Sequence, residues 1–261
     1  MGPAEALAIF AAGAAAGAAN TVVGSGSLIT FPTLLAFGFP PVLANVSNNV
    51  GLVPGNISGT VGYRRELAGQ RRRLSWLGAV AAVGSLAGAV ALLALPPSLF
   101  KVIVPALILI ACVLVAIQPW LSGRVSASRN RRAARQGAVA TGRERISPLL
   151  GAGVFGAAAY GGYFGAALGV LIIGLMGTFL DETMQRVNGA KNALAAVVNG
   201  TAAVVYVIFA HVAWLVVLLI AAGSTLGGFL GAKFGRRLPP WALRAFVVLI
   251  GVISAVKLIG G

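Results

Sequence analysis

Asparagine residues recur in this chain at a constant separation of 143 positions. The residues concerned form three pairs: Asn45 and Asn188, Asn49 and Asn192, and Asn56 and Asn199. A helix turns by about 100° per residue, so the three members of each set share one helix face. Amides on such faces can donate hydrogen bonds to the oxygen atoms of an anion, or they can join neighbouring helices. The spacing therefore predicts a polar lining for a substrate path or, as the alternative, interhelical hydrogen bonds.

Lys191 is the only basic residue whose counterpart in this repeat, Asn48, is polar but uncharged. As a ligand, Lys191 would neutralise an anion beside Asn188 and Asn192. Lysine also extends readily to a membrane surface, so an interfacial position is the alternative. Arg186 lies off the asparagine face, and we expect it to anchor the helix at the interface.

The run Gly24, Ser25, Gly26 and Ser27 separates two apolar segments. Such a joint can leave a helix N-terminus inside the membrane, where free N–H groups and the helix dipole attract anions. The run lacks the Lys-Ser/Thr of a phosphate-binding loop. A tight turn between two helices is the alternative. A second joint around 161–165 aligns with the first only after a shift of about two residues.

Residues suited to catalysis or metal binding do not form a recognisable set. The single histidine is His211 and the single cysteine, Cys112, lies in an apolar segment that predicts a core position. The acidic residues all fall at or outside the ends of the apolar segments: Glu5, Glu66, Glu144, Asp181 and Glu182. We therefore expect neither an enzyme nor a metal or cofactor site.

The composition determines which elements can position these residues. The chain has 261 residues, of which 58% are hydrophobic and 10% charged, and its mean hydropathy is +0.93. Soluble domains carry about 45–50% apolar and about 25% charged residues, so a soluble fold and a disordered chain are both excluded. Apolar runs of about 20 residues favour an all-α polytopic membrane protein.

The net charge of +15 comes largely from arginines between the apolar segments. Basic loops beside membrane spans mark the cytoplasmic face, so we expect 64–73, 121–147 and 235–240 to be cytoplasmic. This placement makes nucleic-acid binding an unsupported interpretation of the charge.

The 143-residue repeat divides the chain into a first repeat (1–120), an Arg-rich cytoplasmic linker (121–147) and a second repeat (148–261). Five arginines lie in 64–73, whereas the equivalent 207–216 has no Lys or Arg. Equivalent loops thus face opposite sides of the membrane, which predicts two inverted-topology repeats. Each repeat would contain three full transmembrane helices plus a short broken or re-entrant helical hairpin. Inverted repeats are common in secondary transporters, whose substrate site lies near the midplane.

The first joint is followed by Leu28–Leu35, which contains Pro32, then by Gly38, Ala44 and a polar-faced helix. This pattern resembles the TauE/SafE sulfite exporter family, also called the four-toluene-sulfonate uptake permease family. In the second repeat 170–173 holds Val-Leu-Ile-Ile in place of the proline-containing stretch. The resemblance implies transport of small sulfur-containing or organic anions, such as sulfite, sulfonates or thiosulfate.

We therefore expect a multi-pass transporter of the cell (inner) membrane that moves such an anion through a midplane site at the repeat interface. The expected partners are the small anionic substrate and the lipid bilayer. Two alternatives remain: a channel or transporter for a small neutral or carboxylate solute, and a non-transporting membrane scaffold. The oligomeric state is not predicted.

The reversed loop charges predict the outcome of labelling with a membrane-impermeant maleimide. In a Cys112→Ser background, Ala68→Cys should react only from the cytoplasmic side and His211→Cys only from the other side. Intact cells and inverted vesicles give the two measurements. Reaction of both cysteines from one side would contradict the inverted arrangement.

Overall fold

The computed structural model describes residues 1–136, 147–180, 182–234 and 240–260, and within these it is helical without strands. The helices of the first half are α1 (Pro3–Val22), α2 (Ser27–Ala36), α3 (Pro41–Gly62), α4 (Arg71–Ala94) and α5 (Pro97–Gln136). Those of the second half are α6 (Pro148–Tyr163), α7 (Leu168–Phe179), α8 (Met184–Phe209), α9 (Trp214–Phe234) and α10 (Pro240–Gly260).

Five of these helices are long and apolar enough to cross a membrane: α1, α4, α5 as far as Trp120, α8 and α9. Helix α3 has 22 residues, but its asparagines lower its hydropathy and it is not among the five. The prediction of an all-helical polytopic membrane protein is confirmed.

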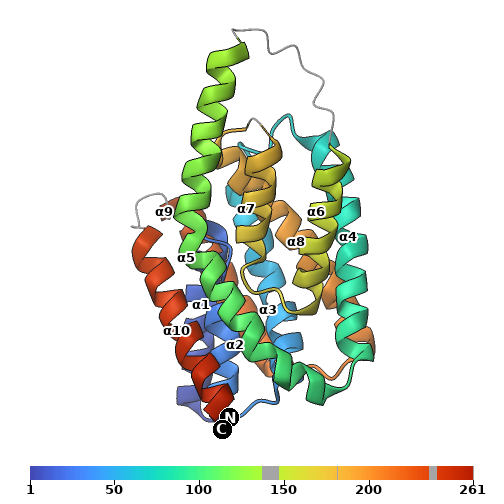
Figure 1. Ribbon diagram of the computed structural model, residues 1–261. Coiled ribbons are helices and arrows are strands. Elements are labelled where there is room, and N and C mark those ends of the chain that lie inside the picture. The colour runs from blue at the N-terminus through green and yellow to red at the C-terminus, as the bar shows by residue number, and fades with distance from the viewer. Residues whose placement is uncertain (137–146, 181, 235–239, 261) are drawn as a thin grey trace.

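The two short helices lie in opposite halves of the bundle. In Figure 1, α2 occupies the lower half of the view and α7 the upper half, and both chain termini lie at the lower end. Each short helix follows a break in the chain, at 23–26 and at 164–167. The connections α3–α4 and α8–α9 lie at opposite ends of the bundle (Figure 1).

Helices in the two halves begin at matching positions. Helices α4 and α9 start at Arg71 and Trp214, and α5 and α10 start at Pro97 and Pro240, so both pairs are 143 positions apart. The packing repeats as well, since α1 packs on α9 and its counterpart α6 packs on α4.

Glycines make the contact between α1 and α9 close. A Cβ atom added to Gly223 or Gly227 would collide with the backbone of Phe10 or Ala14 in α1, and one at Gly231 would press on Ala18. Small residues let membrane helices approach in this way. The spacing of four residues shared by Gly223, Gly227, Gly231 and Gly235 predicts such a seam from the sequence. The structure shows it at the first three, and Gly235 lies outside the described residues.

The basic loops differ in how much of them the structure describes. Residues 64–70 form a turn, and the first turn of α4 contains the remaining arginines of 64–73. Helix α5 continues to Gln136, so the predicted linker 121–147 begins as helix. Residues 137–146 and 235–239, which carry the rest of the two other basic loops, lie outside the described residues.

The glycine seam predicts a position-specific cost of adding one methyl group. Gly227→Ala should lower the free energy of unfolding by about 1–3 kcal/mol, because the methyl group overpacks the contact with α1. Gly200→Ala is the matched control, since a Cβ there meets nothing within 4 Å, and a helical alanine should stabilise by about 0.5–1 kcal/mol. Unfolding in mixed micelles measures both, and equal effects would contradict the seam.

Candidate functional site

The two breaks in the helices meet inside the bundle. The N–H of Gly169, in the first turn of α7, donates to the carbonyl oxygen of Gly24 at 3.1 Å. Gly24 and Gly165 have φ of +88° and +80°, values that suit glycine because it has no Cβ. A Cβ on Gly24 would collide with the backbone of Gly169. Glycine at these positions therefore lets the start of α7 touch the break between α1 and α2.

Lys191 in α8 extends to this meeting point. It is only 1% exposed, and its Nζ donates to the carbonyl oxygens of Asn20 (2.8 Å) and Thr21 (3.0 Å). These carbonyls belong to the last turn of α1, the negative end of its dipole. Among the described residues no carboxylate pairs with Lys191. The alternative in which Lys191 extends to the membrane surface is wrong, because the side chain is buried in the bundle.

The N-terminus of α2 carries hydrogen-bond donors without acceptors. The N–H of Gly26 donates to Asn20 Oδ1 at 2.7 Å. Within the described part of the chain, no acceptor is found for the N–H groups of Ser25 and Ser27. The Oγ atom of Ser25 is also buried without a partner there. Ser27 is buried beside it.

The asparagines of α3 divide between the two breaks. Asn45 Nδ2 donates to the carbonyl oxygen of Tyr163, at the end of α6 (2.9 Å). Asn56 Oδ1 accepts from Asn20 Nδ2 at 3.1 Å, so Asn56 belongs with the break after α1. Asn49, between them, is buried and its Oδ1 has no partner in the described structure.

The asparagines of α8 make fewer side-chain hydrogen bonds than those of α3. Asn192 and Asn199 are buried, and Asn188 is half-buried. Each of the six predicted asparagines has one buried amide atom for which the described residues supply no partner: Asn45 Oδ1, Asn49 Oδ1, Asn56 Nδ2, Asn188 Oδ1, Asn192 Nδ2 and Asn199 Oδ1. Buried polar groups are normally hydrogen-bonded, so this concentration indicates that water or a ligand completes the interior.

Asn20 connects the candidate residues, although the sequence analysis does not single it out. Its side chain bridges Asn56 and Gly26, and its carbonyl oxygen accepts from Lys191. With the two-residue shift its counterpart is Gly161, so the repeat gives no signal there. Its position just before the Gly-Ser run is the one clue that could have identified it.

Aromatic rings surround the second break. The ring of Phe164 packs against Phe31 at 5.3 Å, Phe100 at 6.3 Å and Tyr160 at 6.5 Å, measured between centroids. Tyr163 packs on Phe100 at 5.7 Å. The hydroxyl groups of Tyr160 and Tyr163 are buried without a partner among the described residues. The end of α6 therefore lies in an apolar cluster that retains two unused hydroxyl groups.

An ionic cluster lies where α4 and α8 begin. Glu182 accepts from Arg73 Nη2 at 2.7 Å and from Arg186 Nε at 2.5 Å. Partial burial acts to raise the pKa of Glu182, but the hydrogen bonds and charges of Arg186 and Arg73 outweigh it and hold that pKa below its usual range. Asp181, the acidic neighbour in the sequence, lies outside the described residues.

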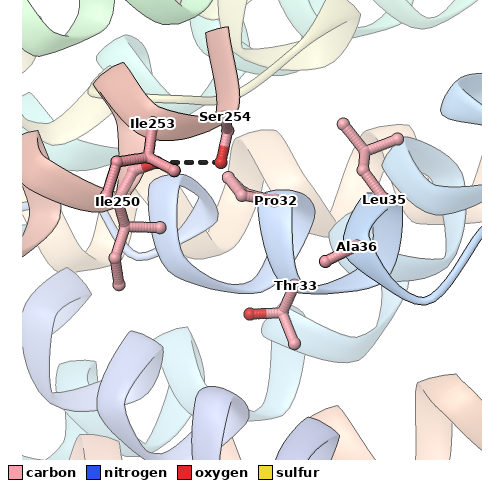
Figure 2. Close-up of a pocket in the computed structure, with 7 residues that line it drawn as sticks. All are labelled: Pro32, Thr33, Leu35, Ala36, Ile250, Ile253 and Ser254. Atoms are coloured by element: carbon pink, nitrogen blue, oxygen red, sulfur yellow. Dashed lines mark hydrogen bonds between the residues drawn. The ribbon is translucent and has the colours of Figure 1, made fainter. Parts of the chain in front are cut away.

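One surface groove is separate from these residues. It has a volume of about 400 Å³ and lies between α2 and α10, as Figure 2 shows. Apolar side chains form most of its wall, and the Ser254 hydroxyl donates within α10 to the Ile250 carbonyl (2.8 Å). The groove contains none of the predicted site residues.

Metal-binding side chains do not gather anywhere in the described part of the chain, where no group of three or more His, Cys, Asp or Glu residues is found. The described interior offers hydrogen bonding by amides, by hydroxyl groups and by the Lys191 ammonium.

The protein consists of apolar helices, two of which are short and follow breaks inside the bundle, and its interior is polar and cationic. These features define a multi-pass helical membrane protein of the transport class. The family model of the sulfite exporter TauE/SafE matches residues 9–258, so the chain belongs to this family and is a membrane transporter. The resemblance noted from the sequence is confirmed.

Similar proteins extend over nearly the whole chain. A probable membrane transporter protein of Haemophilus influenzae is 25% identical over 251 residues, covering 96% of this chain and 93% of that protein. The probable membrane transporter protein ORF9 of a Sinorhizobium species is 23% identical and covers 96% and 91%. The probable membrane transporter protein YfcA of Escherichia coli K12 is 23% identical and covers 94% and 86%. No solved structure matches the chain.

The lowered pKa of Glu182 predicts a pH-dependent contribution to stability. Because folding lowers this pKa, the stabilisation is complete above about pH 4.3, the usual glutamate value, and is lost as the pH falls through the folded-state pKa. Glu182→Gln should cost about 1.5–3 kcal/mol at pH 7, from lost charged hydrogen bonds. The difference in stability between this variant and the unaltered protein should shrink toward pH 3. Thermal unfolding of both proteins in detergent measures it, and a deficit that stays constant with pH would contradict the ionic role.

Proposed function

We propose that this transporter carries a small sulfur-containing or organic anion, of the sulfite, sulfonate or thiosulfate class, across the cytoplasmic membrane. The site would lie near the midplane, where two inverted repeats meet. The observation that supports this most is the buried ammonium of Lys191, which has no carboxylate partner in the described structure and lies beside a break between two helices.

A buried cation requires compensation. Removing an ammonium group from water costs several kcal/mol, and two neutral carbonyl groups offset this only in part. An ammonium has three N–H bonds, and the carbonyls of Asn20 and Thr21 account for two. A bound anion would supply both the missing acceptor and the missing negative charge.

The N-terminus of α2 would bind the same anion. The free N–H groups of Ser25 and Ser27 and the Ser25 hydroxyl are donors, and the dipole of α2 is positive at this end. Gly24 and Gly26 would keep the backbone free of side chains here. Donors of this kind suit the oxygen atoms of a sulfur oxyanion.

The asparagines would line the path on either side of this centre. Amide donors carry no net charge, so they would bind an anion weakly enough to release it again. Asn49 and Asn192, like Asn188 and Asn199, make no side-chain hydrogen bond among the described residues. We assign them to contact with the substrate, together with Asn188 and Asn199. Asn45 and Asn56 also hold the breaks in place.

Three observations support the inverted arrangement. The helix starts match across the two halves, the α1–α9 and α6–α4 contacts correspond, and α2 and α7 lie in opposite halves of the bundle (Figure 1). With the positive loops placed inside, 64–73, 121–147 and 235–240 are cytoplasmic. The two breaks then lie between the repeats, where transporters of this architecture bind substrate.

The family description, which names sulfite, supports this substrate class. The similar proteins are described as probable membrane transporters without a substrate. A carboxylate would also pair with Lys191, so a carboxylate transporter is the second candidate. An uptake assay in proteoliposomes distinguishes a sulfur-anion transporter from a carboxylate transporter. It uses sulfite, thiosulfate, a sulfonate and a carboxylate, each in competition with the others.

The site predicts which substitutions weaken anion binding. Lys191→Gln should raise the Kd by about 10- to 150-fold, since a hydrogen bond to a charged group contributes about 1.5–3 kcal/mol. Asn49→Ala and Asn192→Ala should have smaller effects in the same direction. Calorimetric titration with sulfite and proteoliposome uptake provide the two measurements.

Lys233→Gln is the matched control, because the Lys233 side chain is exposed at the last turn of α9. It should bind and transport like the unaltered protein. If well-folded Lys191, Asn49 and Asn192 variants all do the same, the buried amides and ammonium are structural and the site lies elsewhere.

A further inference from the structure

Ion pairs join the helices at one end of the bundle. Glu182 accepts from Arg73 (2.7 Å) and from Arg186 (2.5 Å). Arg73 lies in the first turn of α4 in the first half of the chain, whereas Glu182 precedes α8 and Arg186 lies in the first turn of α8 in the second half. The ion pair between Arg73 and Glu182 therefore joins the two halves directly.

Further hydrogen bonds join the same two segments. Arg186 Nη1 donates to the carbonyl oxygen of Ala68 at 3.1 Å, and Gln70 Nε2 donates to that of Arg186 at 3.4 Å. Arg73 also donates to Gln70 Oε1. The side chains of Arg73 and Glu182 are only 5% and 14% exposed, so water screens this cluster little.

The equivalent end of the other repeat contains no charge at the equivalent positions. A shift of 143 residues replaces the four polar side chains of the cluster by apolar ones. Glu182 corresponds to Phe39, Arg186 to Leu43, Gln70 to Ala213 and Arg73 to Val216.

Apolar packing closes that second end. Val216 is 2% exposed and belongs to the core against which Phe39 and Ala213 pack. One hydrogen bond joins the halves there, from the N–H of Ala213 to Ser47 Oγ at 3.0 Å. The described residues form no ion pair at this end. The two ends are thus closed by different physical interactions.

We propose that Glu182 is a positioning residue for transport: its pair with Arg73 holds the cytoplasmic end of the path closed, and this end opens when that pair separates. The opposite end closes by apolar contact and the Ala213–Ser47 hydrogen bond, without an ion pair among the described residues. The inference rests on the transport function and orientation proposed above. Glu182 acts on the position of the two halves and does not touch the substrate.

Gly189 is suited to report the opening. A Cβ added there would meet Tyr63, Glu66 and Leu67 at 3.4–3.5 Å, which is ordinary van der Waals contact. The Cβ of a cysteine at 189 is therefore accommodated and is covered by the α3–α4 connection. It becomes accessible only when that connection moves away from α8. Val46, its counterpart 143 positions earlier, is fully buried and reports the other end.

The test uses Gly189→Cys and Val46→Cys, each in a Cys112→Ser background, with an impermeant maleimide applied from either side. Labelling of Gly189→Cys from the cytoplasmic side should be slow. Glu182→Gln should raise its rate by about tenfold, because charged hydrogen bonds are lost. Arg73→Gln should do the same. The double variant should be no faster than Glu182→Gln, because the two residues act through one pair.

Labelling of Val46→Cys should stay constant or fall in the same variants, since opening one end accompanies closure of the other. Glu5→Gln replaces a half-buried acid in the first turn of α1. It is the matched control and should change neither rate. Faster labelling at both positions would mean general loosening and would overturn the inference, as would unchanged labelling at 189 or additive effects.

The result is distinct from a failure of the proposed function. If proteoliposomes transport none of the tested anions while labelling at 189 responds to Glu182, the closure stands and the substrate assignment falls. If transport of sulfite occurs and labelling at 189 does not respond, the closure falls and the substrate assignment stands.

Discussion

The ammonium group of Lys191 lies inside an apolar helical bundle, where an unpaired charge is strongly disfavoured. Its partners are carbonyl groups of Asn20 and Thr21, which are free to accept because α1 ends within the protein. The break in α1 and the buried cation therefore depend on each other. A continuous helix would satisfy those carbonyls internally and leave the ammonium without acceptors.

Backbone groups must approach closely near the Lys191 ammonium, and this explains where the glycines lie. Gly24 and Gly169 touch through their backbones, which places the start of α7 against the end of α1. The glycine seam between α1 and α9 then fixes the position of α1 itself. Hydrogen-bonded contacts lie at the breaks and at the Arg73–Glu182 cluster, whereas the α2–α10 boundary is an apolar groove (Figure 2). Specific contacts between the helices thus include those where α1 and α6 are interrupted.

Periodicity and glycine spacing predict the helices, both breaks and the seam, because each depends on neighbouring residues. Other features were not predictable in this way. Asn20 has a glycine as its repeat counterpart, so comparison of the halves does not reveal it. Arg73 and Glu182 are 109 positions apart, and their counterparts are apolar. Helix α5 continues into the Arg-rich segment because alanine and arginine are strong helix formers, although basic runs are typical of loops.

The central claim is that an anion completes the partial coordination of Lys191 at the N-terminus of α2. Selenite, a sulfite analogue, can be located by the anomalous scattering of selenium in crystals of the unlabelled protein. The account predicts a single strong peak within hydrogen-bonding reach of Lys191 Nζ and the N–H groups of Ser25 and Ser27. A peak confined to the α2–α10 groove, or an empty centre at saturating selenite, would contradict it.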